Sequence, residues 1–306
     1  MTAVDAVLLI AFGGPTKPEE IRPFLANVAR GRRIPPARLE EVARHYEAMP
    51  GGRSPLAERT RGQARALDAV LAQEPPAPPV FVGMRNWHPY LADTLADMAA
   101  RGCRRALGVI LSPFRTEASW ERYQRDVAEA RAQTPGAPEV VFAPPWFEHP
   151  RFVEAVADAA RRALAGVPPD ARPWTPLVFT AHSVPVAMAE ASPYVSDFTT
   201  AARAVAAALG HPRWSLAYQS RSGPPGDAWL EPEVDTVLRS LVADGERHAV
   251  VVPLGFVCDH VEVLHDLDVE ARGVAAKGGM AFHRASTPNT HPAFIAMLAD
   301  LVRRAK

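Results

Sequence analysis

The sequence predicts an α/β fold in which parallel strands alternate with helices that cover both faces of a sheet. Short apolar runs alternate with stretches rich in Ala, Glu and Arg along nearly the whole chain of 306 residues, as they do in folds of this class. The 31 prolines are about twice the usual share, and many lie between these segments, where turns are expected. A chain of this length has room for one large domain or for two of ordinary size.

Seven apolar runs are predicted to form strands, because each is short, continuous and typical of a buried parallel strand. They are Val7–Phe12, Val80–Met84, Ala106–Leu111, Val140–Ala143, Leu177–Ala181, Ser215–Gln219 and Ala249–Leu254. The stretches between and after them are predicted to form helices. They are Arg61–Ala72, Tyr90–Ala100, Arg122–Ala132, Arg151–Leu164, Thr199–Leu209, Val234–Val242 and Pro292–Ala305.

A boundary near residues 145–150 (Pro-Trp-Phe-Glu-His-Pro) divides the chain into two similar halves. Each half opens with an apolar strand that leads into a turn with proline, Gly13-Gly14-Pro15 in the first and His182-Ser183-Val184-Pro185 in the second. The two turns are too short to prove a duplication. They do indicate that each half begins in the same way.

The stretch Gly255–Glu270 is the most informative part of the chain. It follows the apolar run His248–Leu254 and is predicted to open a helix. Three of its carboxylates, Glu262, Asp266 and Glu270, are spaced four residues apart, and His260 and His265 lie close to them in the sequence. The carboxylates recur at every fourth position and therefore share one helix face, where like charges oppose helix formation. Such a face is stable if it is exposed to solvent, binds a cation or forms a proton path. Because it follows a strand of an α/β sheet, where ligands bind, we favour a functional site over a solvated surface.

A second fragment places a histidine in a similar position. The buried run Pro176–Ala181 ends at His182, and Ser183 and Pro185 then break the strand. Loops at such strand ends often carry functional residues, although a histidine there can equally be structural. Together with Glu262, His182 would form an imidazole and carboxylate pair, which suits divalent iron among other metals.

Other fragments occur in a characteristic order along the chain. They are Leu8–Pro15, Val28–Arg32, His45-Tyr46, Gly51–Leu56, Gly83–Pro89, Tyr218–Ser220 and Ala228–Pro232. With the two fragments above, they resemble the ferrochelatase family nearly from end to end. A Gly-Gly-Pro turn alone would be weak evidence, whereas the ordered set that ends in Ala-His-Ser-x-Pro and Asp-His-x-Glu-x-Leu is specific.

The resemblance implies two doubly wound, Rossmann-like domains with parallel four-stranded sheets and an active-site cleft between them. The expected domains are residues 1–147, joined by the C-terminal helix 288–306, and residues 148–287. It also implies an enzyme of haem biosynthesis, a ferrochelatase that inserts Fe(II) into a porphyrin. Iron(II) is then a substrate, and no cofactor is expected to stay bound.

The resemblance assigns the metal chemistry to His182 and Glu262, which would face each other beside the ring centre. Either residue could bind the arriving metal, and either could take a pyrrole proton, so their roles stay open. Asp266, Glu270 and His45 would form a secondary metal site or a proton path.

The resemblance also implies a porphyrin-binding set. Its members are Phe12, Arg30, Arg32, His45, Tyr46, Ser54 and Tyr123. Arg30, Arg32, Ser54 and Tyr123 are the candidates for propionates, since guanidinium forks and hydroxyls bind carboxylates. Ser54 and Tyr123 match positions of the coproporphyrin-dependent ferrochelatases, although one could be a turn residue and the other an ordinary half-buried tyrosine. Two departures are Phe12, where some members have a tyrosine that can ligate product iron, and Ala29, where they have an arginine.

Coproporphyrin III, with four propionates, is the favoured substrate and would give coproheme. The segment from Thr16 to Arg33 is short and holds few aromatics, and it resembles the short lid of the coproporphyrin enzymes. The alternatives are a protoporphyrin IX ferrochelatase that gives protohaem, a chelatase for another tetrapyrrole or metal, and a non-catalytic carrier of a tetrapyrrole or metal.

Composition restricts the other partners. Basic and acidic residues number 34 each, so no net charge attracts nucleic acid. Two cysteines, Cys103 and Cys258, are too few for a disulfide framework or for a four-cysteine iron–sulfur cluster from this chain alone. Cys258 is either a soft metal ligand or a small buried residue. No presequence or membrane-crossing apolar run is seen, so we expect a cytoplasmic enzyme that passes its product to another haem-pathway enzyme.

Overall fold

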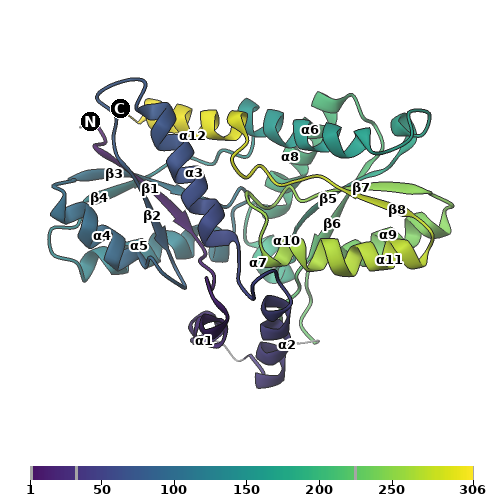
Figure 1. Cartoon of the computed structure of the whole chain (residues 1–306), viewed down its shortest axis with the longest axis horizontal. Coiled ribbons are helices and arrows are strands. Elements are labelled where there is room, and N and C mark those ends of the chain that lie inside the picture. The colour runs from purple at the N-terminus through teal and green to yellow at the C-terminus, as the bar shows by residue number, and fades with distance from the viewer. Residues whose placement is uncertain (1–2, 32–33, 224–225, 306) are drawn as a thin grey trace. The chain divides into compact units, whose positions relative to one another are not determined.

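The chain forms two compact units in a computed structural model that describes residues 3–31, 34–223 and 226–305. Unit 1 comprises Met1–Pro113, Glu117–Trp146 and Asn289–Lys306, and unit 2 comprises Phe114–Thr116 and Phe147–Pro288. Each unit holds one four-stranded sheet with helices beside it (Figure 1).

The sheet of unit 1 is entirely parallel, with the strand order β2-β1-β3-β4. Its strands are β1 (Ala6–Ala11), β2 (Val80–Met84), β3 (Arg105–Ile110) and β4 (Glu139–Phe142). All six residues of β1 are buried, as expected of a central parallel strand that is covered on both faces. Leu8 and Ile10 point toward helices α4 (Leu91–Ala100) and α5 (Arg122–Ala132), with which they form one hydrophobic core.

The remaining helices of unit 1 are α1 (Ile21–Ala29), α2 (Pro36–Glu47), α3 (Leu56–Leu71) and α12 (Pro292–Arg304). Helices α3 and α12 pack against each other, and α3 also contacts β1 and β2 (Figure 1). The ion pair of Arg303 with Glu74, at 2.8 Å, and the edge-on contact of Phe294 with Trp146 fasten the C-terminal helix to unit 1.

The sheet of unit 2 repeats the topology of the first, with the order β6-β5-β7-β8 and parallel pairing throughout. Its strands are β5 (Leu177–His182), β6 (Trp214–Gln219), β7 (His248–Val252) and β8 (Ala281–Arg284). Its helices are α6 (Pro150–Ala165), α7 (Val186–Glu190), α8 (Tyr194–Leu209), α9 (Val234–Ala243), α10 (Val261–Leu264) and α11 (Arg272–Lys277). Val178 and Val251 belong to a core that includes residues of α9, α10 and α11, while α6 and α8 pack on each other and contact the sheet strands.

The predicted α/β class with parallel sheets and helices on both faces is confirmed. All seven predicted strands are present, but the eighth, β8, was not predicted. Its four residues, Ala281-Phe-His-Arg284, are two apolar residues followed by two polar ones, so they contain no apolar run of strand length. β8 lies at the edge of the sheet and has a neighbouring strand on one side only. An edge strand needs fewer apolar residues, so its sequence signal is weaker.

Two predictions about helices were incomplete or wrong. Helices α1 and α2 were not predicted, and α3 begins five residues earlier than the predicted helix at Arg61. The helix expected over the acidic stretch is not regular, because a π-helical turn, η4 (Asp266–Ala271), lies between α10 and α11. This turn matters for the site, since a π-turn shifts the side chains off the α-helical periodicity.

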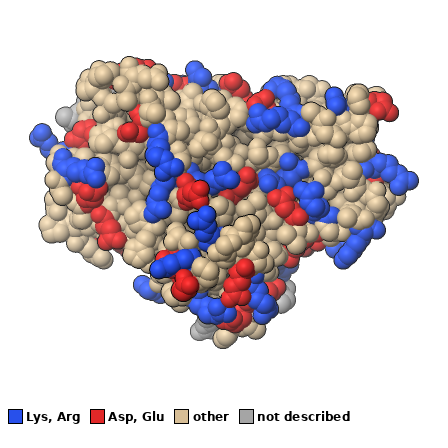
Figure 2. All heavy atoms as spheres, in the orientation of Figure 1, with Lys and Arg blue, Asp and Glu red and all other residues tan. Residues whose placement is uncertain are grey.

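No helix in the described ranges is both long and apolar enough to cross a membrane. On the face shown in Figure 2, basic and acidic side chains are scattered among each other. This distribution accords with the balanced charge of the sequence.

Glu20 organises the turn that follows β1. It ends a short 3-10 helix, η1 (Pro18–Glu20), and its Oε2 accepts hydrogen bonds from the Thr16 amide at 2.8 Å, the Thr16 hydroxyl at 2.9 Å and the Trp87 indole at 2.8 Å. Burial raises the pKa of this carboxyl, but the bonds from Thr16 and Trp87 outweigh it, and the net pKa is lowered from 4.5. The folded chain therefore stabilises the ionised form of the Glu20 carboxyl more than the unfolded chain does.

We expect Glu20→Gln to lower the melting temperature by about 3 to 6 °C at pH 7, because charge-assisted hydrogen bonds are lost. A lowered pKa contributes stability that is complete above the unfolded value, 4.5, and that is lost as pH falls through the folded value. The gap between wild type and variant should therefore narrow below about pH 4. Melting curves at pH 7 and pH 3.5 test this, with the exposed neighbour Glu19→Gln as control; an equal gap at both pH values would contradict it.

Candidate active site

His182 is the last residue of β5, and hydrogen bonds to the backbone at this point hold it in place. The Tyr194 hydroxyl donates a hydrogen bond to the His182 carbonyl at 2.7 Å. Burial, with smaller effects of Tyr218 and Glu262, raises the pKa of Tyr194 far above its usual value, so this hydroxyl stays a donor. The Ser183 amide donates to the Gln219 carbonyl at 2.7 Å and extends the pairing of β5 with β6 by one residue. These contacts fix where the imidazole leaves the sheet.

Glu262 lies on α10, the four-residue helix that follows β7 by way of a loop. Its Oε1 is 3.8 Å from His182 Nε2, and its Oε2 is 3.5 Å from His260 Nε2. One carboxylate thus contacts two imidazoles, one from β5 and one from the residue that precedes α10. The backbone of Glu262 is tied to the sheet as well, since the Gln219 amide group donates to its carbonyl at 2.6 Å.

The electrostatics of this cluster keep Glu262 ionised. Burial raises the pKa of its carboxyl, but the charge of His182 and the hydrogen bond and charge of His260 outweigh burial and lower the pKa to about 2. Glu262 therefore carries its negative charge throughout the neutral range. A carboxylate oxygen beside two imidazole nitrogens is a ligand set that suits divalent iron, zinc, cobalt and related ions.

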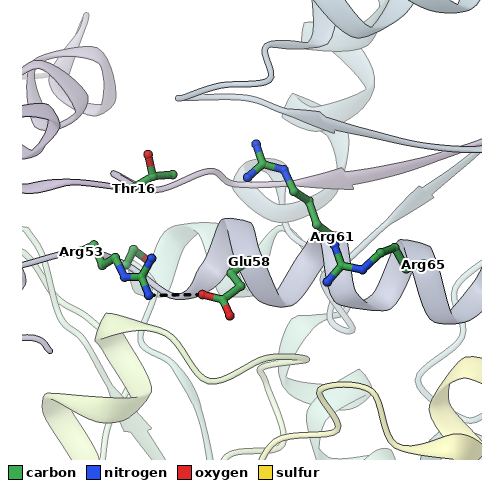
Figure 3. A pocket seen from close by; sticks show the side chains of 6 residues that line it. Thr16, Arg53, Glu58, Arg61 and Arg65 are labelled. Atoms are coloured by element: carbon green, nitrogen blue, oxygen red, sulfur yellow. Dashed lines mark ion pairs between the residues drawn. The ribbon is translucent and has the colours of Figure 1, made fainter. Parts of the chain in front are cut away.

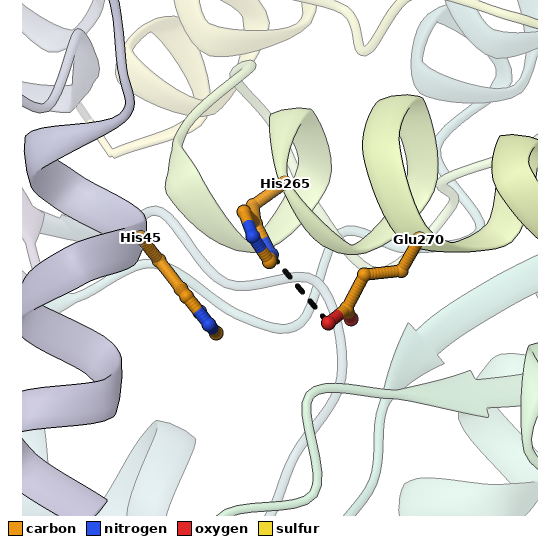
Figure 4. A group of neighbouring side chains, drawn as sticks. All are labelled: His45, His265 and Glu270. Carbon is orange, nitrogen blue, oxygen red and sulfur yellow. Dashed lines mark ion pairs between the residues drawn. The ribbon is translucent and has the colours of Figure 1, made fainter.

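The acidic stretch continues through the π-turn, where the predicted helix face is not formed. The three carboxylates were expected to stack at every fourth position of one α-helix. Instead His265 Nδ1 lies 3.6 Å from Asp266 and 3.9 Å from Glu270, the ion pair drawn in Figure 4. The backbone explains this, because the Glu270 amide bonds to the His265 carbonyl, five residues earlier. The hydrogen bond of Asp266 raises the pKa of His265, burial opposes the rise, and Glu270 adds to it.

Asp266 also accepts a hydrogen bond from the Ser220 hydroxyl. Ser220 follows β6 and has φ +62°, a left-handed conformation that serine rarely adopts. A strained residue that presents its side chain to the acidic stretch is the kind of outlier that occurs at functional sites.

The porphyrin-binding candidates belong to unit 1. Phe12 follows β1 and lies edge-on to Phe24, and Tyr46 of α2 is buried against the same ring. Tyr123 of α5 is also buried, with the Arg85 guanidinium 4.4 Å above its ring. The structure therefore places both tyrosines in the packed interior of the unit.

The polar candidates are distributed over separate elements. Arg30 ends α1 and donates to the Asn27 side chain at 2.8 Å. His45 lies in the last turn of α2, and Arg32 lies outside the residues that the structure describes. Ser54 is buried, and its hydroxyl accepts a hydrogen bond from the Leu56 amide at 3.3 Å.

Ser54 also lines a cationic pocket of about 270 Å³ that the sequence did not suggest (Figure 3). The other lining residues are Thr16, Arg53, Glu58, Arg61 and Arg65. Glu58 forms an ion pair with Arg53 at 3.6 Å. Within the described parts of the chain, Arg61 and Arg65 have no carboxylate at ion-pair distance. They lie four residues apart on α3, so two guanidinium groups share one side of this helix. The pocket therefore suits a small anion such as a carboxylate.

Comparisons with known proteins identify the family of this chain. The family model named Ferrochelatase matches residues 4–306. The chain belongs to the ferrochelatase family.

Individual ferrochelatases are similar over nearly the whole chain. The coproporphyrin III ferrochelatase of Mycobacterium avium is 49% identical over 302 residues, which cover 97% of this chain and 87% of that protein. The protein of the same name from Nocardia farcinica is 46% identical over 310 residues, with 98% and 88% covered. Among solved structures, SirB from Bacillus subtilis with Fe3+ has a TM-score of 0.63 at 12% identity and covers 98% of this chain and 94% of that one. The last likeness shows a shared fold.

Sequence reasoning did not assign roles to several residues that support the cluster around His182 and Glu262. Tyr194 and Ser220 each contribute one hydroxyl. Gln219 and Ser220 belong to the Tyr218–Ser220 fragment, which by itself indicates no role for either side chain. The left-handed turn at Ser220 gives no sequence signal, because glycine or asparagine would normally mark such a position.

We expect Glu262→Gln to weaken the binding of a divalent metal ion by at least about tenfold, since outer-shell substitutions alone typically cost 10–100-fold. The change keeps the shape of the side chain and removes the charge that the two imidazoles face. Titration of the protein with cobalt(II), followed by its visible absorption, measures this. Glu246→Gln, which alters a carboxylate paired with Arg213 at the other end of β7, is the matched control. Equal cobalt affinity of wild type and Glu262→Gln would exclude Glu262 as a ligand.

Proposed function

We propose that the protein is a coproporphyrin III ferrochelatase, which inserts iron(II) into the macrocycle and gives coproheme. The observation that carries the proposal is the contact of Glu262 with His182 and His260, in a chain of the ferrochelatase family. The substrate is proposed from the names of its relatives, because proteins 46–49% identical over nearly the whole chain are coproporphyrin III ferrochelatases.

Metal insertion requires a site that binds iron(II) and then releases it to the porphyrin. Glu262 supplies a carboxylate that is already ionised, because its pKa is lowered to about 2. His182 and His260 supply imidazole nitrogens on either side of that carboxylate. A hydrated iron ion would exchange some of its waters for these protein ligands. The pyrrole nitrogens would then replace the protein ligands.

The reaction also releases two protons, because a free-base porphyrin carries two N–H groups and the metallated product none. His182 can accept a pyrrole proton at Nε2, with the ionised Glu262 stabilising the imidazolium 3.8 Å away. From there a path leads outward through His265, Asp266 and Glu270. The side chains of His265 and Asp266 are 13% and 16% exposed, and that of Glu270 is 54% exposed. Glu270 would therefore be the end of this route that opens to solvent.

The carboxylates of coproporphyrin III require cations or hydroxyls. The Ser54 pocket, with Arg61 and Arg65, suits one propionate, and Arg30 offers another guanidinium. Phe12 cannot ligate iron, so the proposal includes no bond between this residue and the product. It also includes no resident cofactor: Cys103 and Cys258 are buried cysteines in different units, and iron(II) enters as substrate. A cytoplasmic location and transfer of coproheme to a further haem-pathway enzyme complete the proposal.

Anaerobic turnover with iron(II) tests the function, with coproporphyrin III and protoporphyrin IX offered in parallel and the loss of free-base absorbance followed. We expect faster loss of coproporphyrin III, since four propionates give more anchoring contacts than two. His182→Ala should reduce the rate by at least about 100-fold, the usual contribution of a positioned proton acceptor.

Each other result has a definite meaning. Preference for protoporphyrin IX would retain the chemistry and overturn the substrate. Tight binding of both porphyrins without metal insertion would make the protein a carrier and refute the enzymatic proposal. Unchanged turnover in His182→Ala would remove this residue from the mechanism.

A further inference from the structure

Arg284, the last residue of β8, forms ion pairs with two carboxylates that flank Glu262 in the sequence. Its Nη1 is 3.0 Å from Asp259, and its Nε is 2.8 Å from Asp268. The three side chains are largely buried, with 14%, 12% and 26% of their surfaces exposed. Buried charges at this spacing interact strongly, because little solvent screens them.

The segment between the two carboxylates carries the metal chemistry proposed above. His260, Glu262, His265 and Asp266 all lie within it. Its secondary structure is short, with four residues in α10 followed by a π-turn. Helices of one turn are not stable by themselves and depend on contacts with the rest of the fold. Something outside the segment must therefore hold its two ends.

The geometry points to Arg284 as a positioning residue that fastens this segment to the sheet and so sets the metal affinity of Glu262. This inference rests on the proposed function for the identity of the metal. Strand β8 pairs with β7, the strand that leads into the segment. The guanidinium therefore connects both ends of the segment to the sheet from which it leaves.

The planar fork of arginine explains why this residue suits the position. Two nitrogens of one guanidinium reach two different carboxylates, a bridge that the single ammonium of lysine reproduces poorly. Arg272 also pairs with Asp268, at 3.2 Å. Arg272 is itself tied to β8, because its Nη1 donates to the Phe282 carbonyl at 3.2 Å. It therefore supports the Asp268 end of the segment, whereas Arg284 pairs with the carboxylates at both ends.

A positioning role differs from a simple contribution to stability in what it changes. If Arg284 acts through the segment, its loss should weaken the binding of the metal and leave the binding of porphyrin largely intact. If it only stabilises unit 2, both substrates should be affected in parallel with the melting temperature.

The test compares wild type with Arg284→Lys, Arg284→Met and the control Arg213→Met. Arg213 also joins a carboxylate, Glu246, and a backbone carbonyl, that of Trp174, within unit 2. Four quantities are measured: the melting temperature, the cobalt(II) affinity, and the KM values for iron(II) and for coproporphyrin III.

We expect Arg284→Met to lose about 10–100-fold in cobalt affinity, the usual effect of outer-shell substitutions, and to raise the KM for iron(II) by a similar factor. Arg284→Lys, which keeps the charge, should recover part of this loss. The KM for coproporphyrin III should stay within twofold of wild type in both variants. Arg213→Met should match wild type in all metal measurements.

Cobalt affinity and iron KM within twofold of wild type in Arg284→Lys and Arg284→Met would overturn the inference. Equal losses for metal and porphyrin would overturn it too, since they indicate general damage. If Arg284→Met does not fold, Arg284→Lys alone decides by the same criteria. Absence of turnover in wild type would refute the proposed function, and the cobalt affinities would still test the role of Arg284.

Discussion

The site depends on the close approach of Gly255 to β5. The Gly255 amide bonds to the Thr180 carbonyl at 2.9 Å, and a Cβ at this residue would lie 2.8 Å from the Cα and Cβ of Ala181. Only hydrogen fits there. The chain that leaves β7 can therefore cross directly over the end of β5, one residue before His182. A larger residue would force the loop outward and carry Glu262 away from the imidazole.

Parallel pairing explains why this approach creates a site. The carboxyl ends of β5, β6 and β7 lie at one edge of the sheet, and the chain order reverses between β5 and β7. Open α/β sheets bind ligands at such switch points, because the loops on either side diverge there. His182 comes from one of these strands, Gln219 from the second, and the segment with Glu262 from the third. No single stretch of sequence contains the whole site.

The acidic segment is tolerated because its carboxylates have imidazole, hydroxyl or guanidinium partners. Glu262 contacts two imidazoles, and Asp266 accepts from a hydroxyl and lies beside His265. Asp268 pairs with two guanidinium groups. The charge is thus compensated permanently at the ends of the segment by arginines. In its middle it is compensated by histidines, whose charge depends on protonation and on bound metal. In the proposed function, this arrangement would let protons and a cation exchange in the middle of the segment while its ends stay fixed.

The sequence allowed the strands, the parallel class and the sheet-edge position of His182 and Glu262 to be predicted, because these follow from apolar runs and strand ends. The roles of both residues remain predictions. Three features could not be predicted from local pattern. The π-turn depends on tertiary contacts, β8 has no apolar run of strand length, and Arg284 looks like any other surface arginine until β8 is paired with β7.

The repeated topology shows why residues, and not the fold, determine the chemistry. At the switch point of unit 1, β1 ends at Ala11 and is followed by Phe12, Gly13 and Gly14, none of which has a titratable side chain. Gly13 has φ +94°, and a Cβ there would lie 2.9 Å from the Trp87 backbone nitrogen. In unit 2, the last residue of β5 is His182. One strand order therefore supports an apolar, closely packed turn in unit 1 and an imidazole and carboxylate pair in unit 2.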